Sequence, residues 1–219
     1  MPSLKEIKNR ITSVQSTRKI TSAMKMVASS KLHHAQMMIE NMLPYENLLE
    51  SMLKTYLEAE VDARTVLTLP REVKKAALVV FASNSSLCGG FNANVLKMMQ
   101  QAVDGYKKRG VEVIIYPVGR KVSEKVNKLG LNTAGNFNSL ADKPNARDCV
   151  KIGEELQELF RKDEIDAVEM IYHHFKSAGS QILLTKKLLP IDVEKAMDYD
   201  HTRDLENNVV TAGAQAYLD

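Results

Sequence analysis

The sequence predicts an α/β protein, with a long N-terminal helix followed by a mainly parallel sheet that carries helices on its faces. The first observation is that no glycine occurs before Gly89, and that Pro44 is the only proline between Pro2 and Pro70. The second is that short apolar runs alternate with amphipathic segments after Pro70. This alternation is typical of strands and helices that follow one another in a parallel sheet.

The helix is predicted over residues 3–57. Ser3 and Glu6 have the spacing of a reciprocal N-terminal cap, in which each side chain accepts from the other's backbone amide. Such a helix is about 80 Å long, whereas a compact globule of this chain length is only about 45 Å across, so the helix is not buried in its own domain. Pro44 predicts a kink or an end, and two helices, 3–43 and 45–57, are the alternative.

An apolar seam follows the helix at alternating spacings of three and four residues, as in a coiled-coil strand. The middle of the seam is polar, and a shifted apolar line through Ile20, Met24 and Val27 crosses this gap, as where a repeat slips phase. The apolar seam positions are Leu4, Ile7, Ile11, Val14, Leu32 and Ile39.

The region after Pro70 divides into predicted strands and helices. Continuous apolar runs predict buried strands, and apolar residues on one face predict the helices. Strands are expected at 76–82, 111–118, 131–134, 167–176 and 181–189, the last two as a hairpin, and helices at 92–108, 121–129 and 146–161. The predicted organisation is a helical shaft at 1–69, an α/β domain at 70–190 and a polar, partly disordered tail at 191–219.

Charge is concentrated on the first segment of the chain. Residues 1–31 carry seven basic side chains and one acidic one, a balance of 7 − 1 = +6, while the formal net charge of the whole chain is +3. The remaining residues therefore sum to −3. This distribution predicts an acidic partner surface or a polyanion near the N-terminus.

The residues offer little for catalysis. The turn at 83–90 follows a strand and precedes a helix, but it matches no phosphate-binding motif and holds no lysine, so a tight structural turn is favoured. No nucleophile with a base, no histidine or cysteine pattern for a metal, and no run of 18 apolar residues is found. Cys88 and Cys149 are expected to be free thiols. No catalytic, cofactor or metal site is predicted.

The basic helix is the strongest indication of function, and three interpretations of it remain open on the residues alone. It suits nucleic acid, but base-stacking aromatic residues are absent before Tyr45. It suits a membrane surface, but Ser and Thr dilute its apolar face. The helix also suits a shaft that is surrounded by other protein chains. Its polar and basic contacts with them would not fix it in one orientation.

Two motifs carry a family resemblance. The segment Leu4–Ile11 (LKEIKNRI) with Thr17–Ala28 (TRKITSAMKMVA), and the turn Ser85–Asn92 (SSLCGGFN), are similar to the two signatures of the gamma subunit of the bacterial rotary (F-type) ATP synthase. They occur in the family's order, and the match of architecture extends over essentially all 219 residues.

The resemblance implies a non-catalytic central rotor that couples transmembrane ion flow, of hydrogen ions or sodium, to ATP synthesis or hydrolysis. The N-terminal helix would form half of an antiparallel coiled coil inside a ring of alpha and beta subunits, with catalysis on the beta subunits. The Rossmann-like domain would contact the epsilon subunit and the membrane rotor ring. No cofactor, nucleic acid or direct membrane insertion is implied, and the location is peripheral, at the cytoplasmic face of the bacterial inner (plasma) membrane.

The resemblance also assigns residues. Leu87, Cys88, Gly89 and Gly90 belong to the structural turn. The positions expected to contact the alpha/beta ring are Arg10, Arg18, Lys19, Ile20, Met24, Lys25, Met26, Val27 and Lys31.

Two departures from the family pattern bear on these expectations, one in the turn and one at the C-terminal helix. Asn84 and Ser86 stand where the family usually has Asp and Gly, so Ser86 is expected to adopt a glycine-like backbone. The family's C-terminal helix is missing, so the exposed seam is expected to fray or to pair with another copy.

A nucleotide-dependent enzyme with a helical appendage and a polyanion-binding coiled coil are the alternative functions.

Overall fold

The computed structural model describes residues 3–59, 65–177 and 179–191 of the chain. Contacts divide the described residues into two units, the helix α1 and a domain that spans 65–191. Most of the predicted polar tail, from residue 192 onward, lies outside the described residues.

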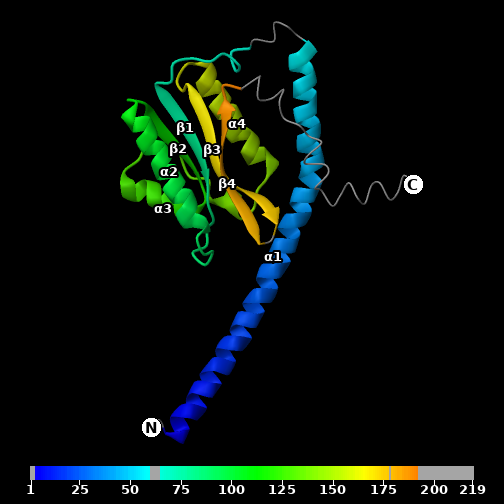
Figure 1. The fold of residues 1–219 in the computed structure, drawn as a ribbon, viewed down its shortest axis with the longest axis vertical. Helices are drawn as coiled ribbons and strands as arrows, with labels where there is room; N and C mark the ends of the chain where they lie inside the picture. The colour runs from blue at the N-terminus through cyan, green and yellow to red at the C-terminus, as the bar shows by residue number, and fades with distance from the viewer. Residues whose placement is uncertain (1–2, 60–64, 178, 192–219) are drawn as a thin grey trace, which may run out of the picture. The chain divides into compact units, whose positions relative to one another are not determined.

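Helix α1 (Leu4–Ala59) has 56 residues, and at 1.5 Å per residue it is about 84 Å long. The predicted cap is confirmed: the Ser3 amide donates to Glu6 Oε2 over 3.2 Å, and the Glu6 amide donates to Ser3 Oγ over 3.3 Å. Pro44 lies inside the helix, so the alternative of two helices that end and restart there is wrong. Figure 1 shows α1 as one unbroken helix that bends along its length, which is how helices accommodate an internal proline.

The domain is built on a four-stranded sheet of order β2-β1-β3-β4. Strands β1 (Lys75–Phe81), β2 (Glu112–Val118) and β3 (Ala167–Ser177) are parallel, and β4 (Ser180–Leu189) is antiparallel to β3. This confirms the mainly parallel sheet with a hairpin at one edge. The weak strand expected at 131–134 is reduced to one isolated bridge, in which Thr133 pairs with Ile115.

Helices cover both faces of the sheet, as Figure 1 shows. Helices α2 (Phe91–Lys108) and α3 (Arg120–Leu129) lie on one face. Helix α4 (Ala146–Arg161) and the short 3₁₀ helix η1 (Asn138–Ala141) lie on the other. The domain is therefore a three-layer α/β/α structure with two apolar cores.

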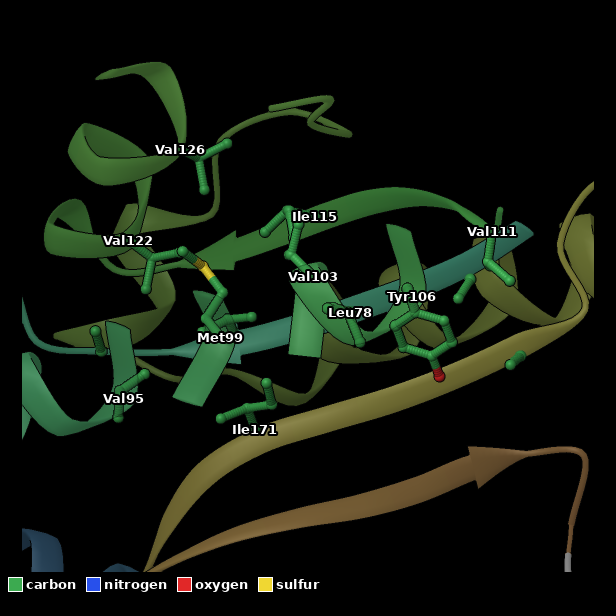
Figure 2. Close-up of a cluster of buried hydrophobic side chains, with 14 residues drawn as sticks. Leu78, Val95, Met99, Val103, Tyr106, Val111, Ile115, Val122, Val126 and Ile171 are labelled. Carbon is green, nitrogen blue, oxygen red and sulfur yellow. The ribbon is translucent and has the colours of Figure 1, made fainter. Parts of the chain in front are cut away.

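The core under α2 and α3 is shown in Figure 2. Val95, Met99 and Val103 extend from α2 toward Leu78 on β1 and Ile171 on β3, and all five are fully buried. This pattern explains the apolar periodicity of α2 and the continuous apolar run of β1, because a central strand of such a sheet is buried on both faces.

The second core lies under α4. Leu156 and Phe160 from the helix pack with Tyr116 on β2 and Val168 on β3. The Tyr116 hydroxyl donates to Glu155 Oε1 over 2.9 Å. Burial, followed by this hydrogen bond, raises the pKa of Tyr116, so the phenol stays protonated and keeps its partner.

Gly119, between β2 and α3, is the position where the backbone most needs glycine. Its φ is +109°, and a Cβ there would lie 2.0 Å from the Ala82 carbonyl oxygen. The Ala82 amide donates to the Val118 carbonyl over 2.8 Å, so the backbones after β1 and β2 are held in close approach. This approach sets the position of the turn that follows β1.

We expect Gly119→Ala to lower the free energy of unfolding by at least about 2 kcal/mol, since the Cβ meets backbone that cannot rotate away. The matched control is Gly105→Ala in α2, where a Cβ meets nothing within 4 Å. That change should stabilise the chain by about 0.5–1 kcal/mol through helix propensity. Urea unfolding of the two variants would contradict this account if Gly119→Ala were as stable as the parent.

Candidate functional site

The predicted partner-contact surface lies along the N-terminal half of α1. All nine positions that the sequence assigns to it are exposed, and each carries either a positive charge or a large apolar side chain. The exposed fractions of the apolar members are 62% for Ile20, 57% for Met24, 67% for Met26 and 60% for Val27. The remaining members, all exposed, are Arg10, Arg18, Lys19, Lys25 and Lys31.

The predicted seam is exposed as well, apart from Ile39, which is half-buried. Leu4 is the most exposed at 77%, and the others, Ile7, Ile11, Val14 and Leu32, are 41–66% exposed. So much exposed apolar surface on one helix is typical of a binding surface. The structure thus brings basic and apolar predicted residues together on one rod.

The threonines of this surface bond within the helix. Thr12, Thr17 and Thr21 donate their hydroxyls to the carbonyls four residues earlier, over 3.1, 2.9 and 2.8 Å. While these bonds last, the hydroxyl hydrogens are not available to a partner. The donors left on this half of α1 include seven flexible Lys and Arg side chains, which suit contacts that change partners.

The turn after β1 is organised by Asn92, a buried side chain in the first turn of α2. Its Oδ1 accepts from the Ser83 amide over 3.0 Å, and its Nδ2 donates to the Ser85 carbonyl over 2.8 Å and lies 2.9 Å from Cys88 Sγ. Gly89 has φ +55°, a conformation that favours glycine. The polar groups of the turn are therefore bonded to Asn92 at the start of the following helix. Leu87 in this turn has 87% of its surface exposed.

Asn84 links this turn to two other segments. Its Nδ2 donates to Asp142 Oδ2 over 2.6 Å and to the Asn138 carbonyl over 2.9 Å, and its Oδ1 accepts from the Arg120 amide over 2.7 Å. An amide suits this place because it donates to one side and accepts from the other. A carboxylate would lose both donors and face Asp142.

The expectation that Ser86 adopts a glycine-like backbone is wrong. Among the described residues other than glycine, Asp163 alone has a positive φ. The turn places its left-handed residue at Gly89 instead, so serine at position 86 causes no backbone strain.

A pocket of about 460 Å³ lies beside this turn, at the carboxyl ends of β1 and β2. Its lining is mainly apolar and includes Phe81, Phe91, Leu140 and Tyr172. His173 closes one side, with its ring stacked on Phe91 at a centroid distance of 4.1 Å. Burial lowers the pKa of His173, which favours the neutral ring.

Several features of the site were beyond sequence reasoning. The close approach at Gly119 and the bonds of Asn84 join residues far apart in sequence, and the pocket needs three strands and η1 together.

Within the described ranges, no group of three or more His, Cys, Asp or Glu residues is arranged to hold a metal ion. In the same part of the chain, no helix has the length and apolar character required to cross a membrane.

The chain is similar to known proteins over its whole length. The family model described as ATP synthase matches residues 3–219. The ATP synthase gamma chain of Bacteroides fragilis is 50% identical over 219 residues, which are 100% of this chain and 76% of that protein. The ATP synthase gamma chain of Phocaeicola vulgatus is 52% identical over 194 residues, or 88% of this chain and 67% of that protein.

The fold is similar to that of a solved structure with a different sequence. It is the central stalk and c-ring of the Tetrahymena thermophila mitochondrial ATP synthase, with a TM-score of 0.58 and 22% identity, covering 82% of this chain and 84% of that chain. At this identity the likeness supports the architecture alone.

We expect Asn84→Asp to destabilise the domain by about 1 kcal/mol at neutral pH, because the new carboxylate faces Asp142 and no longer donates to the Asn138 carbonyl. Repulsion raises the folded-state pKa of the carboxyl pair above its unfolded value, so the loss should shrink as the pH falls and the pair takes up a proton. Urea unfolding at several pH values measures this. The control, Asn94→Asp in the first turn of α2, places a carboxylate where the helix end favours it, and equal losses in both variants would contradict the account.

His173 should make the domain less stable in acid. Its folded-state pKa lies below the usual 6.5 because of burial, so its contribution is present above that value and is lost as the pH falls, when the unfolded chain binds the proton more readily. Between about pH 7 and 5, His173→Gln should therefore lose less stability than the parent. The exposed neighbour His174 provides the control: His174→Gln should keep the parental pH dependence. A parental slope in His173→Gln would refute the assignment.

Proposed function

The chain belongs to the ATP synthase gamma-chain family, and from this membership we propose that it couples transmembrane ion flow to ATP synthesis or hydrolysis as a central rotor. In this proposal α1 lies inside a ring of alpha and beta subunits, which hold the catalytic sites, and the gamma chain itself is not catalytic. The observation that carries the proposal is a 56-residue helix whose basic and apolar side chains are exposed together.

The charge of α1 supports this arrangement. Residues 3–31 carry a balance of +6, and long-range attraction to acidic loops on several ring subunits favours insertion without fixing one orientation. Met24 and Met26, both more than half exposed, offer flexible apolar contacts that adapt to a changing partner surface. A shaft that turns against its collar needs this combination of attraction and adaptable contact.

The α/β domain has a different role in the proposal. It contacts the epsilon subunit and the membrane rotor ring, and the assembly lies at the cytoplasmic face of the bacterial inner membrane. Two compact cores on a mainly parallel sheet give the domain a rigid body through which torque can pass. The closed turn at Asn92 supports a structural rather than a nucleotide-binding role for residues 83–90.

Assembly with the alpha and beta subunits of the same organism tests the proposal. We expect the chain to co-purify with them and to restore ATP hydrolysis to the alpha/beta complex. Lys25→Glu should weaken this assembly several-fold at low salt and less at high salt, since it reverses one charge of the contact surface.

The matched control is Lys97→Glu on the exposed face of α2, which makes the same change of charge on a different helix. Equal weakening by both variants would contradict a specific role of α1. Tight ATP binding by the isolated chain at a site that includes Gly89 and Gly90 would instead favour a nucleotide-dependent enzyme. Salt-dependent DNA binding would favour a polyanion-binding coiled coil.

A further inference from the structure

We propose that Arg71 is a positioning residue of the rotor, which fixes the chain segment entering the α/β domain to the loop between α4 and β3 so that torque enters the domain without local opening. The inference rests on the proposed rotor function and adds the residue through which that function loads the domain. It depends on where the chain enters and leaves the sheet, on the contacts of Arg71, and on the burial of its partner Asp166.

Both chain connections of the domain lie at one edge of its sheet. Strands β1 and β3 begin at this edge and β4 ends there, as their pairing requires and as Figure 1 shows. The chain enters through residues 65–74 and continues from β4 through Ile191. The Ile191 amide donates to the Leu67 carbonyl over 2.8 Å, and both side chains pack against the core under α4. The entering and leaving segments are therefore held together.

Arg71 joins the entering segment to the end of α4 and the loop that follows it. Its Nη2 donates to the Ile165 carbonyl over 3.0 Å and to the Phe160 carbonyl, and its Nη1 pairs with Asp163. The guanidinium carbon lies 3.8 Å from the centre of the Phe160 ring, whose face attracts a cation. We call Arg71 and the loop 162–166 the joint.

Asp166 extends the joint to the first residues of β1. Its Oδ1 lies 3.4 Å from Arg71 Nε, and its Oδ2 accepts from the amides of Lys74 and Lys75, each over 2.9 Å. The side chain of Asp166 is only 11% exposed, and a carboxylate so far removed from water needs such partners. Arg71 and Asp166 together fix the entering segment at the starts of both β1 and β3.

The backbone of the loop shows that its conformation is held from outside. Asp163 has φ +59° and is the one non-glycine residue with a positive φ in the part of the chain that the structure describes. Such a conformation persists where the surrounding contacts impose it. Arg71 supplies these contacts on both sides of Asp163, at the carbonyls of Phe160 and Ile165.

A twisting load gives this joint a mechanical role. In the proposed rotor, α1 and the domain turn together while different partners resist them, so force passes along the segments that connect the two. Hydrogen bonds to one neighbouring segment can open one after another, whereas the contacts of Arg71 bridge the entering segment, α4 and the loop before β3. A planar guanidinium suits this role because its donors keep a fixed geometry, while lysine offers one charge on a flexible chain.

Hydrogen exchange of the full chain tests whether the joint acts as a unit. In Arg71→Lys the charge remains but the fixed fork of donors is lost, so we expect the amides of Lys74, Lys75 and Ile191 to exchange about tenfold faster through local opening. Amides of α2 should keep their parental rates. The matched control is Arg120→Lys at the opposite edge of the sheet, where the arginine donates to the Asn84 carbonyl; it should leave the three amides unchanged. Parental rates at these amides in Arg71→Lys, or equal acceleration across the whole domain, would overturn the proposal.

ATP-driven ion pumping by the complete synthase in membrane vesicles tests the mechanical role. With the ion gradient collapsed by an ionophore, we expect the Arg71→Lys complex to hydrolyse ATP at the parental rate. With the gradient allowed to build up, the gradient that it sustains should fall at least about two-fold, because the load opens the joint.

The control for pumping is Val103→Ala, which leaves a cavity in the core under α2 and α3, away from the joint. Urea unfolding checks that the two variants lose similar stability, and Val103→Ala should sustain the parental gradient. A parental gradient in Arg71→Lys, or an equal loss in both variants, would overturn the role of Arg71. Failure of the parental chain to support pumping would instead overturn the rotor function itself, and with it the torque that the joint is proposed to carry.

Discussion

The apolar positions of α1 set the main constraint on this chain. A helix about 84 Å long has seam residues along almost its whole length, and their exposed side chains leave water when a second apolar surface packs against them. The basic side chains of the same helix act in the same direction, because they favour an acidic neighbour. The proposed rotor role is one way of meeting this requirement.

The α/β domain has no such requirement, and this difference divides the work between the two units. Its central strand β1 is buried between α2 and α3 on one face and α4 on the other, so each face of the sheet has an apolar core of its own within the described residues, although the edge strand β4 is largely exposed. Its turns are fixed by bonds inside the domain, as at Asn84 and Asn92. A rigid body joined to a helix that depends on partners is a suitable construction for a coupling subunit.

Local patterns in the sequence predicted most of the fold. The apolar run at 76–82 identified a central strand because both of its faces are buried. Ser3 and Glu6 identified the start of α1 because the two capping residues are only three positions apart. The alternative of two helices separated at Pro44 was wrong because a long helix tolerates one lost hydrogen bond when the residues on both sides form helix well.

What the sequence could not predict depends on long-range contacts. The need for glycine at position 119 arises from a carbonyl 37 positions earlier, at Ala82, and the fit of Asn84 depends on Arg120, Asn138 and Asp142. The exposure of the predicted contact residues on α1 follows from the length of the helix and was therefore predictable. Which subunits cover them depends on surfaces outside this chain.

Hydrogen exchange of the dilute monomer, compared with the chain assembled with alpha and beta subunits, tests the central claim directly. The account predicts that amides of α1 exchange quickly in the monomer and become protected on assembly, while those of β1 and β3 are protected in both. Strong protection of α1 in the monomer would contradict it.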